Sequence, residues 1–143
     1  MVFALAVGLL MWLVSRAGWL DGYAFPAQRF TAVAAGIAGL CTMILGVVTF
    51  RKARTTVNPL KPDAASTLVV TGIYRWTRNP MYLGALLLLA SWAIYLGNPV
   101  SGAFLVIFIV YLNRFQIAPE EAALTTRFVP EFVAYKSRVR RWV

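Results

Sequence analysis

The sequence predicts an all-α protein embedded in a membrane, an integral-membrane helical bundle with four transmembrane helices. Of its 143 residues, 60% are hydrophobic and only 13% are charged, whereas a soluble domain is nearer to half apolar and a quarter charged. Uncharged apolar stretches also recur along the chain, and a helix needs about 20 such residues to cross a bilayer. The length suits one domain, so we expect a single integral-membrane domain over residues 1–143.

Four spans are expected, at approximately 1–20, 30–50, 80–96 and 99–116. The clearest is 30–50, which carries no charge between Arg29 and Arg51. The first stretch is uncharged as far as Arg16 and lacks a basic start and a cleavage site, so we interpret it as a span and not as a signal peptide. The last two spans form a hairpin, because the step Gly97-Asn98-Pro99 breaks a helix.

Positive charge predicts the orientation of these spans. The formal net charge is +9. Basic residues gather between the second and third spans and after the fourth: Arg51, Lys52, Arg54, Lys61, Arg75 and Arg78, then Arg114, Arg127, Lys136, Arg138, Arg140 and Arg141. The positive-inside rule places both segments, and both termini, in the cytoplasm. We therefore expect a multi-pass protein of a bacterial inner membrane with membrane lipids as partners, and no nucleic acid at this hydrophobicity.

The composition also excludes several kinds of site. The chain has one cysteine, Cys41, and no histidine. It therefore has neither a disulfide framework nor the commonest metal ligand and general base. We expect no metal, and we expect no Ser/His/Asp chemistry.

Small residues recur at four-residue spacing in the second span, as Ala32 and Gly36 and as Ala35 and Gly39. Small residues so placed let helix backbones approach closely in lipid. We interpret them as a packing face; a gap that admits a ligand is the alternative.

The connection over 55–82 is too apolar and aromatic for a simple tether, so we expect it to fold against the bilayer face. At its end, Asn79 suits an N-cap and Pro80 suits the first position of the third helix. In a second interpretation, the amides behind Pro80 form an anion site together with Arg78. Three aromatic residues nearby could face a cation or a flat ring: Tyr74, Trp76 and Tyr82.

After the fourth span we expect a cytoplasmic or interfacial helix over 119–143. Glu120 and Glu121 follow Pro119. Acidic residues in a first turn are favoured by the helix dipole, or one carboxylate binds the ammonium group of a ligand. From Phe128 onward aromatic and basic residues alternate, which is typical of a helix lying on a membrane surface.

At these positions the sequence resembles a known superfamily. The stretch LVVTGIYRWTRNPMYLG, Leu68 to Gly84, is similar to a motif of the isoprenylcysteine carboxyl methyltransferases and phospholipid methyltransferases, which are integral-membrane enzymes. A second motif of that superfamily is matched further on by Glu120, Glu121 and Leu124, then Phe128, Phe132 and Tyr135, then Arg141 and Trp142. The similarity runs from about Thr55 to the end of the sequence.

The resemblance implies an S-adenosylmethionine-dependent methyltransferase, with the donor bound by the two cytoplasmic segments. Together with the physical interpretation above, it gives these donor-site residues: Ser66, Thr67, Leu68, Val69, Tyr74, Arg78, Asn79, Pro80, Met81, Tyr82 and Glu120. Helix-start amides and Arg78 suit the carboxylate of the donor, Glu120 suits its ammonium, and tyrosines suit its sulfonium or adenine. Methyl transfer is a direct displacement that depends on alignment, so no catalytic residue is assigned.

The acceptor is expected to be lipid-like or isoprenylcysteine-like, with a phospholipid amine as the alternative. Gln116 stands where the isoprenylcysteine enzymes place an arginine for the substrate carboxylate, and Arg114 is the nearby substitute; these two are the expected substrate-binding residues. The sequence also departs from the superfamily at Asn79, where histidine is usual in those enzymes, and at Val129-Pro130.

Two other classes stay open. A membrane reductase shares a related carboxyl-terminal architecture by resemblance, but we find no added loop for a nicotinamide phosphate. A non-enzymatic four-helix transporter or assembly subunit is the other. Transporters usually carry an ionisable residue within a span, and spans two to four have none.

Overall fold

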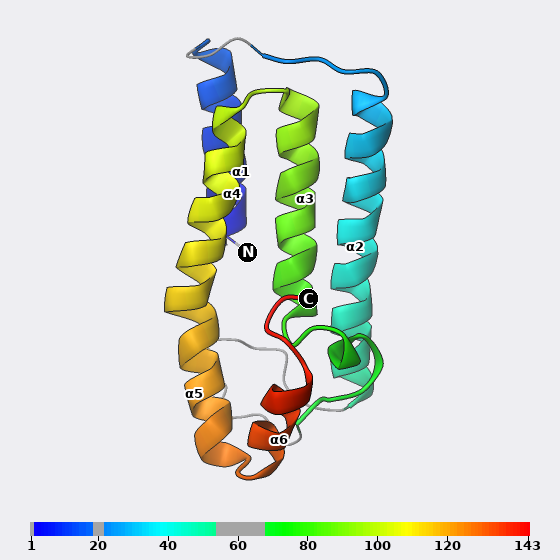
Figure 1. The fold of residues 1–143 in the computed structure, drawn as a ribbon, viewed down its shortest axis with the longest axis vertical. Helices are drawn as coiled ribbons and strands as arrows, with labels where there is room; N and C mark the ends of the chain where they lie inside the picture. The colour runs from blue at the N-terminus through cyan, green and yellow to red at the C-terminus, as the bar shows by residue number, and fades with distance from the viewer. Residues whose placement is uncertain (1, 19–21, 54–67) are drawn as a thin grey trace. The chain divides into compact units, whose positions relative to one another are not determined.

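The computed structural model describes residues 2–18, 22–53 and 68–143, which are largely helical and contain no β-strand (Figure 1). The helices are α1 (Val2–Arg16), α2 (Gln28–Lys52), the 3₁₀ helix η2 (Gly72–Arg75), α3 (Pro80–Leu96), α4 (Val100–Tyr111), the π-helix η3 (Leu112–Ile117), α5 (Ala118–Arg127) and α6 (Glu131–Arg138). The chain divides into two compact units. Unit 1 comprises Met1–Cys41 and Gly84–Val110, and unit 2 comprises Thr42–Leu83 and Tyr111–Val143.

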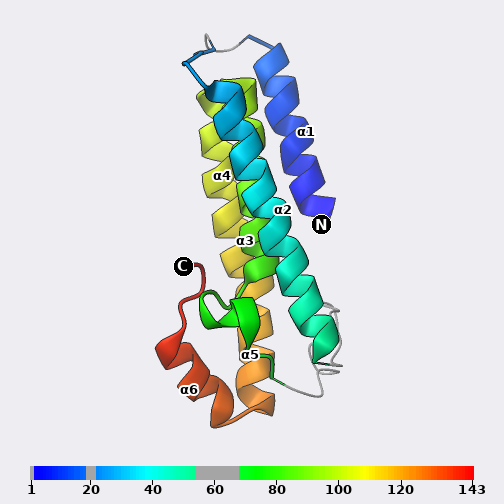
Figure 2. The same cartoon turned by 90° about the vertical axis from the view of Figure 1, so that its right-hand side faces the viewer.

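In unit 1, the parts of α1, α2, α3 and α4 that belong to it lie side by side (Figures 1 and 2). The indole of Trp92 on α3 donates a 3.1 Å hydrogen bond to the carbonyl of Gly8 on α1. The rings of Phe3 and Phe108 stack with centroids 5.7 Å apart and join α1 to α4. These contacts surround an apolar core: Val7, Met11, Ala32, Ala85, Leu89, Ala93 and Phe108.

The small residues of α2 pack against α3, as the sequence predicted. A Cβ on Gly39 would lie 2.8 Å from the carbonyl oxygen of Gly84, and one on Gly36 would lie 3.0 Å from the hydroxyl of Ser91. That hydroxyl donates a 2.7 Å hydrogen bond to the carbonyl of Ala32. Backbone and a short side chain of α3 therefore fill the space beside these glycines.

The predicted break between the third and fourth helices is confirmed. Gly97 takes a φ of 62°, a left-handed conformation that ends a helix at low cost for glycine. Oδ1 of Asn98 then accepts a 2.9 Å hydrogen bond from the amide of Val100, the first residue of α4. At the end of α3, Nε2 of Gln28 donates to the carbonyl of Ile94 at 2.7 Å.

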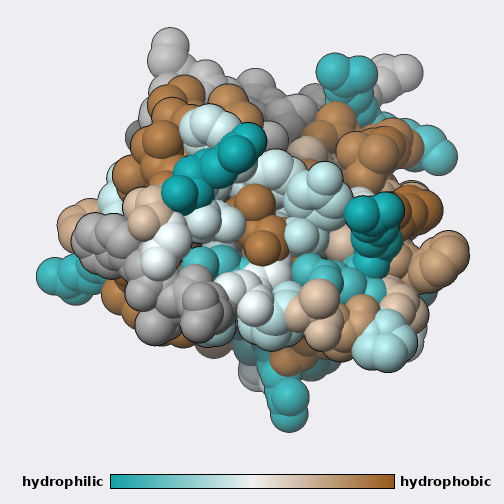
Figure 3. Space-filling view, turned by 90° about the horizontal axis from the view of Figure 1, so that it is seen from above, coloured by the Kyte–Doolittle hydropathy of each residue, from teal (hydrophilic) through white to brown (hydrophobic). Residues whose placement is uncertain are grey.

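Two helices are long and apolar enough to cross a membrane: α2, and the continuous helix Val100–Arg127. The helices α1 and α3 are apolar but shorter. On α2 an apolar stripe faces outward: Phe30, Val33, Ile37 and Leu40 are all more than half exposed. Seen from above, hydrophobic residues lie at several places along the outline of the molecule (Figure 3). The outward-facing apolar stripe of α2 suits contact with lipid and is unusual on a soluble monomer.

The helix that contains α4 continues through η3 into α5, so Pro119 does not begin a new helix as expected. Within η3 the turn is widened, and the amide of Ala118 donates to the carbonyl of Asn113, five residues earlier. Proline has no N–H to donate and crowds the carbonyl four residues before it. The widened turn next to Pro119 accommodates both properties without ending the helix.

The single helix expected over 119–143 is divided in the structure. The helix α5 ends at Arg127, because Phe128 leaves helical geometry at φ −121° and ψ 50° and Pro130 follows. The helix α6 then runs from Glu131 to Arg138, and extended backbone begins at Val139. Phe132 and Tyr135 of α6 are buried in unit 2, so the aromatic side of this helix packs on protein and does not lie on lipid.

Candidate functional site

The turn that opens α3 lies in unit 2 and is held by its own polar groups. The hydroxyl of Thr77 accepts a 3.2 Å hydrogen bond from the amide of Asn79. The carbonyl of Asn79 accepts the first helical bond, 2.9 Å from the amide of Leu83, so α3 begins at Pro80 as predicted. The side chain of Asn79 does not cap the helix as expected. Its Nδ2 donates instead to the carbonyl of Arg141 at 2.9 Å.

One turn into α3, a tyrosine reaches the carboxylate of Glu120 on α5. The hydroxyl of Tyr82 donates a 2.6 Å hydrogen bond to Oε1 of Glu120. Nε2 of Gln116, in η3, donates to the same oxygen at 3.1 Å. Within the described part of the chain, Glu120 has no basic side chain within ion-pair distance. The result is a half-buried carboxylate that is hydrogen-bonded but not charge-neutralised.

A buried tyrosine lies next to this carboxylate. Tyr74 of η2 is 4% exposed, and its ring meets that of Phe50 with centroids 5.4 Å apart. Its hydroxyl has no hydrogen-bond partner among the described residues. Burial raises the pKa of Tyr74 above its usual value, and the neighbouring Tyr135 and Glu120 raise it further. A neutral hydroxyl donor therefore lies near Glu120, and no described residue accepts its hydrogen bond.

Tyr135 of α6 fixes the backbone of Tyr74. Its hydroxyl donates a 2.7 Å hydrogen bond to the Tyr74 carbonyl in a buried setting. Burial raises the pKa of Tyr135 to about 12, although the nearby charge of Arg78 acts in the opposite direction.

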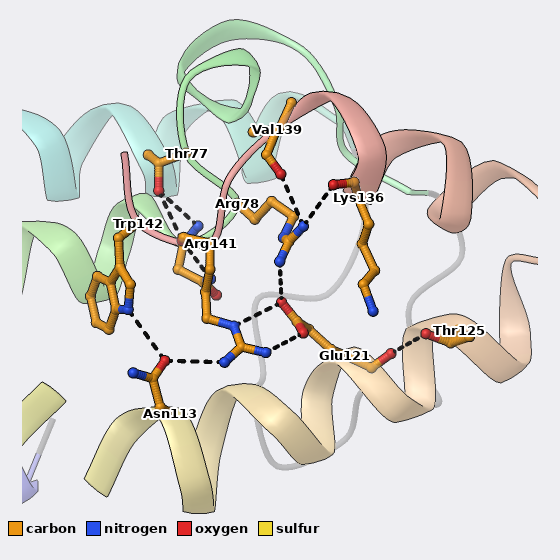
Figure 4. A network of polar contacts seen from close by, with 10 residues as sticks. Thr77, Arg78, Asn113, Glu121, Thr125, Lys136, Val139, Arg141 and Trp142 are labelled. Atoms are coloured by element: carbon orange, nitrogen blue, oxygen red, sulfur yellow. Dashed lines mark hydrogen bonds and ion pairs between the residues drawn. The ribbon is translucent and has the colours of Figure 1, made fainter. Parts of the chain in front are cut away.

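Glu121, the residue after Glu120, forms ion pairs with two arginines (Figure 4). Its Oε1 lies 2.8 Å from a terminal nitrogen of Arg78, and its Oε2 lies 2.7 Å from a terminal nitrogen of Arg141. Arg78 also donates to the carbonyls of Val139 at 2.9 Å and Lys136 at 3.2 Å. These bonds tie the turn before α3 to α5 and to the segment that follows α6.

Most of the expected site residues lie in unit 2, in two adjoining groups. Tyr82, Gln116 and Glu120 are joined directly by hydrogen bonds, and Tyr74 lies beside them. Arg78 and Asn79 belong to the second group, with Glu121 and Arg141 as partners, so Arg78 does not contact Glu120 as an ion pair.

The remaining expected residues have other surroundings. Pro80 and Met81 face α2, where a Cβ on Gly46 would lie within 3.2 Å of both side chains. Leu68 is half-buried and Val69 is buried, whereas Arg114 is exposed. Ser66 and Thr67 lie outside the described residues.

Sequence analysis assigned no partner to Glu121, Arg141 or Asn113. Arg141 donates to Oδ1 of Asn113 at 3.3 Å, and so does the indole of Trp142 at 3.2 Å. The pair Arg140-Arg141 suggested surface charge, and only the fold shows which of the two arginines turns inward.

Comparison with known proteins gives the same superfamily as the motifs. The family profile of phospholipid methyltransferases matches residues 27–130. An uncharacterised protein of Haemophilus influenzae is 46% identical over 63 residues, which are 44% of this chain and all of that protein. The protein-S-isoprenylcysteine O-methyltransferases of Saccharomyces cerevisiae and Homo sapiens are 39% identical over 82 residues and 33% identical over 73 residues.

The matches to those two enzymes cover 55% and 51% of this chain, but only 33% and 26% of the enzymes themselves. No solved structure matches. Because the family profile covers well over half of the chain and includes both α3 and the start of α5, the chain belongs to the phospholipid methyltransferase family, in the superfamily of membrane methyltransferases that also includes the isoprenylcysteine carboxyl methyltransferases.

Proposed function

We propose that unit 2 binds S-adenosylmethionine and that the protein transfers its methyl group to a lipid-like or isoprenylcysteine-like acceptor. The observation that supports this most directly is the environment of Glu120. Its carboxylate is held by Tyr82 and Gln116 and meets no cation among the described residues, with the buried hydroxyl of Tyr74 nearby. S-adenosylmethionine carries an ammonium and a sulfonium, and a carboxylate without a protein cation suits either group.

The residues present therefore fit the donor. Glu120 would hold its ammonium, and the aromatic rings of Tyr74 and Tyr82 would face its sulfonium or adenine. The turn over Asn79–Tyr82 and the segment Ser66–Val69 would complete the site. Arg78 would contribute by fixing that turn, since its guanidinium is already bound by Glu121.

In the proposed reaction the donor supplies the reactive group, and the protein supplies its orientation and a site without water. When bound, S-adenosylmethionine supplies an activated methyl group on its sulfonium. The protein's residues orient the donor through fixed polar groups and exclude water through buried ones, such as Tyr74, Ile117 and Phe132. Alignment of a nucleophile with the methyl carbon can provide a large share of the rate.

The acceptor side of the site would involve Gln116 and Arg114. A phospholipid amine is the second candidate acceptor, and it is favoured by the family profile that matches this chain. An isoprenylcysteine-like acceptor is favoured by the named relatives in yeast and mammals. Methyl incorporation from labelled S-adenosylmethionine into aminophospholipid and into a prenylcysteine analogue, measured side by side, distinguishes the two.

We also propose that α1, α2, α3 and α4 are four spans of one domain, with the connection between α2 and α3, the segment after α4 and both termini on the cytoplasmic side of a bacterial inner membrane. The distribution of charge supports this. Unit 2 contains Arg51, Arg78 and Arg141 with most of the other basic residues, while unit 1 carries Arg16 and Arg29. Cytoplasmic loops are the ones enriched in lysine and arginine. Accessibility of cysteines introduced at position 53 and at position 24 to an impermeant reagent tests the topology.

The donor site is tested by calorimetric binding of S-adenosylhomocysteine to the detergent-solubilised protein. Glu120→Gln removes the charge and keeps the shape, and we expect the affinity to fall about tenfold or more, because hydrogen bonds to charged groups contribute about 1.5–3 kcal/mol. Glu131→Gln is the matched control, because Glu131 is an exposed residue of α6. Equal affinity in the two variants would remove Glu120 from the site.

A further inference from the structure

Arg141 contacts both of the segments that the proposed donor site requires. Its guanidinium donates to Glu121 of α5 at 2.7 and 3.2 Å and to Asn113 of η3 at 3.3 Å. Its carbonyl accepts hydrogen bonds from Nδ2 of Asn79 at 2.9 Å and from the hydroxyl of Thr77 at 3.3 Å. One residue therefore holds the turn before α3 and the start of α5 in fixed positions.

Glu121, the partner of Arg141, is satisfied within the protein. Both of its carboxylate oxygens accept from arginines, and its side chain is 11% exposed. Glu120, the preceding residue, has no ion-pair partner among the described side chains and is bound instead by Tyr82 and Gln116. The two adjacent carboxylates thus have different tasks: Glu120 is available to a cationic ligand and Glu121 is not.

We infer that Glu121 and Arg141 are positioning residues, which hold Glu120 on α5 against Tyr82 on α3 and thereby set the affinity for the methyl donor. This inference rests on the proposed function of unit 2. It assigns a role to the segment after α6, and specifically to one of two neighbouring arginines. An error of about 1 Å in the placement of such groups can lower a reaction rate by roughly 100-fold.

The test compares Arg141→Met with Arg140→Met. Each variant removes one positive charge at almost the same point of the sequence, but the side chain of Arg140 is exposed. We expect Arg141→Met to raise the Kd for S-adenosylhomocysteine about tenfold or more, the scale of one lost hydrogen bond to a charged group. We expect Arg140→Met to leave it within about twofold, because exposed charges contribute little. Isothermal titration calorimetry on the full chain in detergent gives both values.

A second comparison separates positioning from loss of structure. Arg141 is proposed to act through the Tyr82–Glu120 hydrogen bond, so the effects of Arg141→Met and Tyr82→Phe on Kd should not add in the double variant. The Tm of each variant, measured in the same detergent, shows whether a lower affinity is accompanied by a loss of structure. Arg141→Lys keeps the charge but loses the planar, forked set of donors, and we expect it to restore part of the affinity.

The outcomes are distinct. If the unaltered protein binds S-adenosylhomocysteine and Arg141→Met binds it as tightly as Arg140→Met, the positioning role is overturned while the proposed function stands. Additive effects on Kd in the double variant would also overturn it. If Arg141→Met cannot be purified in folded form, Arg141→Lys decides: an affinity equal to that of the unaltered protein overturns the inference, and a reduced affinity with an unchanged Tm supports it. Absence of binding by the unaltered protein would instead overturn the proposed function and this inference with it.

Discussion

The hydroxyl of Tyr82 donates a 2.6 Å hydrogen bond to the carboxylate of Glu120, two residues that are 38 positions apart in the chain. This bond connects the first turn of α3 to the first turn of α5. Pro80 begins α3, whereas Pro119 lies in the first turn of α5 within the continuous helix Val100–Arg127. The two motifs of the superfamily therefore meet in unit 2 through side chains that each motif supplies.

We expect Tyr82→Phe to weaken binding of S-adenosylhomocysteine about tenfold, because the Glu120 carboxylate loses its shortest hydrogen bond, and bonds to charged groups contribute about 1.5–3 kcal/mol. Calorimetry of the purified variant measures this. Tyr95→Phe is the control, since Tyr95 belongs to unit 1 and is 58% exposed. A Tyr82→Phe protein with unchanged affinity would contradict the assignment of Glu120 as a donor ligand.

Tyr135→Phe should lower the free energy of unfolding by about 1–3 kcal/mol, the usual cost of leaving a buried polar group without its partner. The group left behind is the carbonyl of Tyr74, which accepts a 2.7 Å hydrogen bond from Tyr135. Unfolding in a denaturant series with fluorescence detection reports the change.

The same tyrosine predicts a dependence of stability on alkaline pH. Burial raises the pKa of Tyr135 to about 12, above the ordinary value of about 10. Between these values the folded protein holds a proton that the unfolded chain releases, so the contribution is complete below pH of about 10 and is lost as the pH rises toward about 12. The Tm of the unaltered protein should therefore fall more steeply over this window than that of Tyr135→Phe. Parallel curves would contradict the prediction.

Glu121→Ala should be strongly destabilising, by roughly 3–5 kcal/mol, because it leaves Arg78 and Arg141 facing one another without the carboxylate between them. Glu131→Ala, on the exposed side of α6, should cost less than about 1 kcal/mol. Thermal unfolding of the two variants in the same detergent compares them directly, and equal Tm values would show that the two ion pairs contribute nothing to the fold.

Two glycine substitutions are expected to change stability in opposite directions, because α3 packs closely against Gly39 and no described atom lies near Gly102. Gly39→Ala places a methyl group 2.8 Å from the carbonyl of Gly84, so the helices must separate and stability should fall. Gly102→Ala on α4 meets no described atom within 4 Å and should raise helix stability by up to about 1 kcal/mol. Retention of monomeric, folded protein on heating in detergent measures both, and a stabilising Gly39→Ala would contradict the close approach.

Local signals predicted the larger features of the fold. Gly97, Asn98 and Pro99 marked the break between α3 and α4, because each disfavours a continuous helix. Pro80 marked the start of α3, because proline suits the first position of a helix. Spacing of small residues indicated a packing face on α2, and the structure shows that α3 lies against it. These features depend on adjacent residues or on residues about one helical turn apart, and both patterns can be recognised in a single sequence.

Features that depend on partners distant in sequence were not predicted. Pro119 suggested a helix start, but the π-helix before it allows the helix to continue past the proline. Arg78 was expected at the donor site, which stays a prediction; its ion pair with Glu121, 43 residues away, could not be predicted from the sequence. The superfamily motif includes Arg141, but the sequence does not name its partners, since only the fold brings Asn113 and Glu121 to this arginine.

The segment after α6 is held largely through its main chain. The amide of Arg78 donates to the carbonyl of Arg140, and both Thr77 and Asn79 donate to the carbonyl of Arg141. Contacts of this type depend on the path of the backbone, so relatives that diverge at position 140 can keep them intact. The guanidinium of Arg141 additionally binds Glu121 and Asn113, whereas the side chain of Arg140 is exposed. We therefore expect substitutions to be tolerated at position 140 and resisted at position 141, a contrast that sequences of bacterial relatives would display directly.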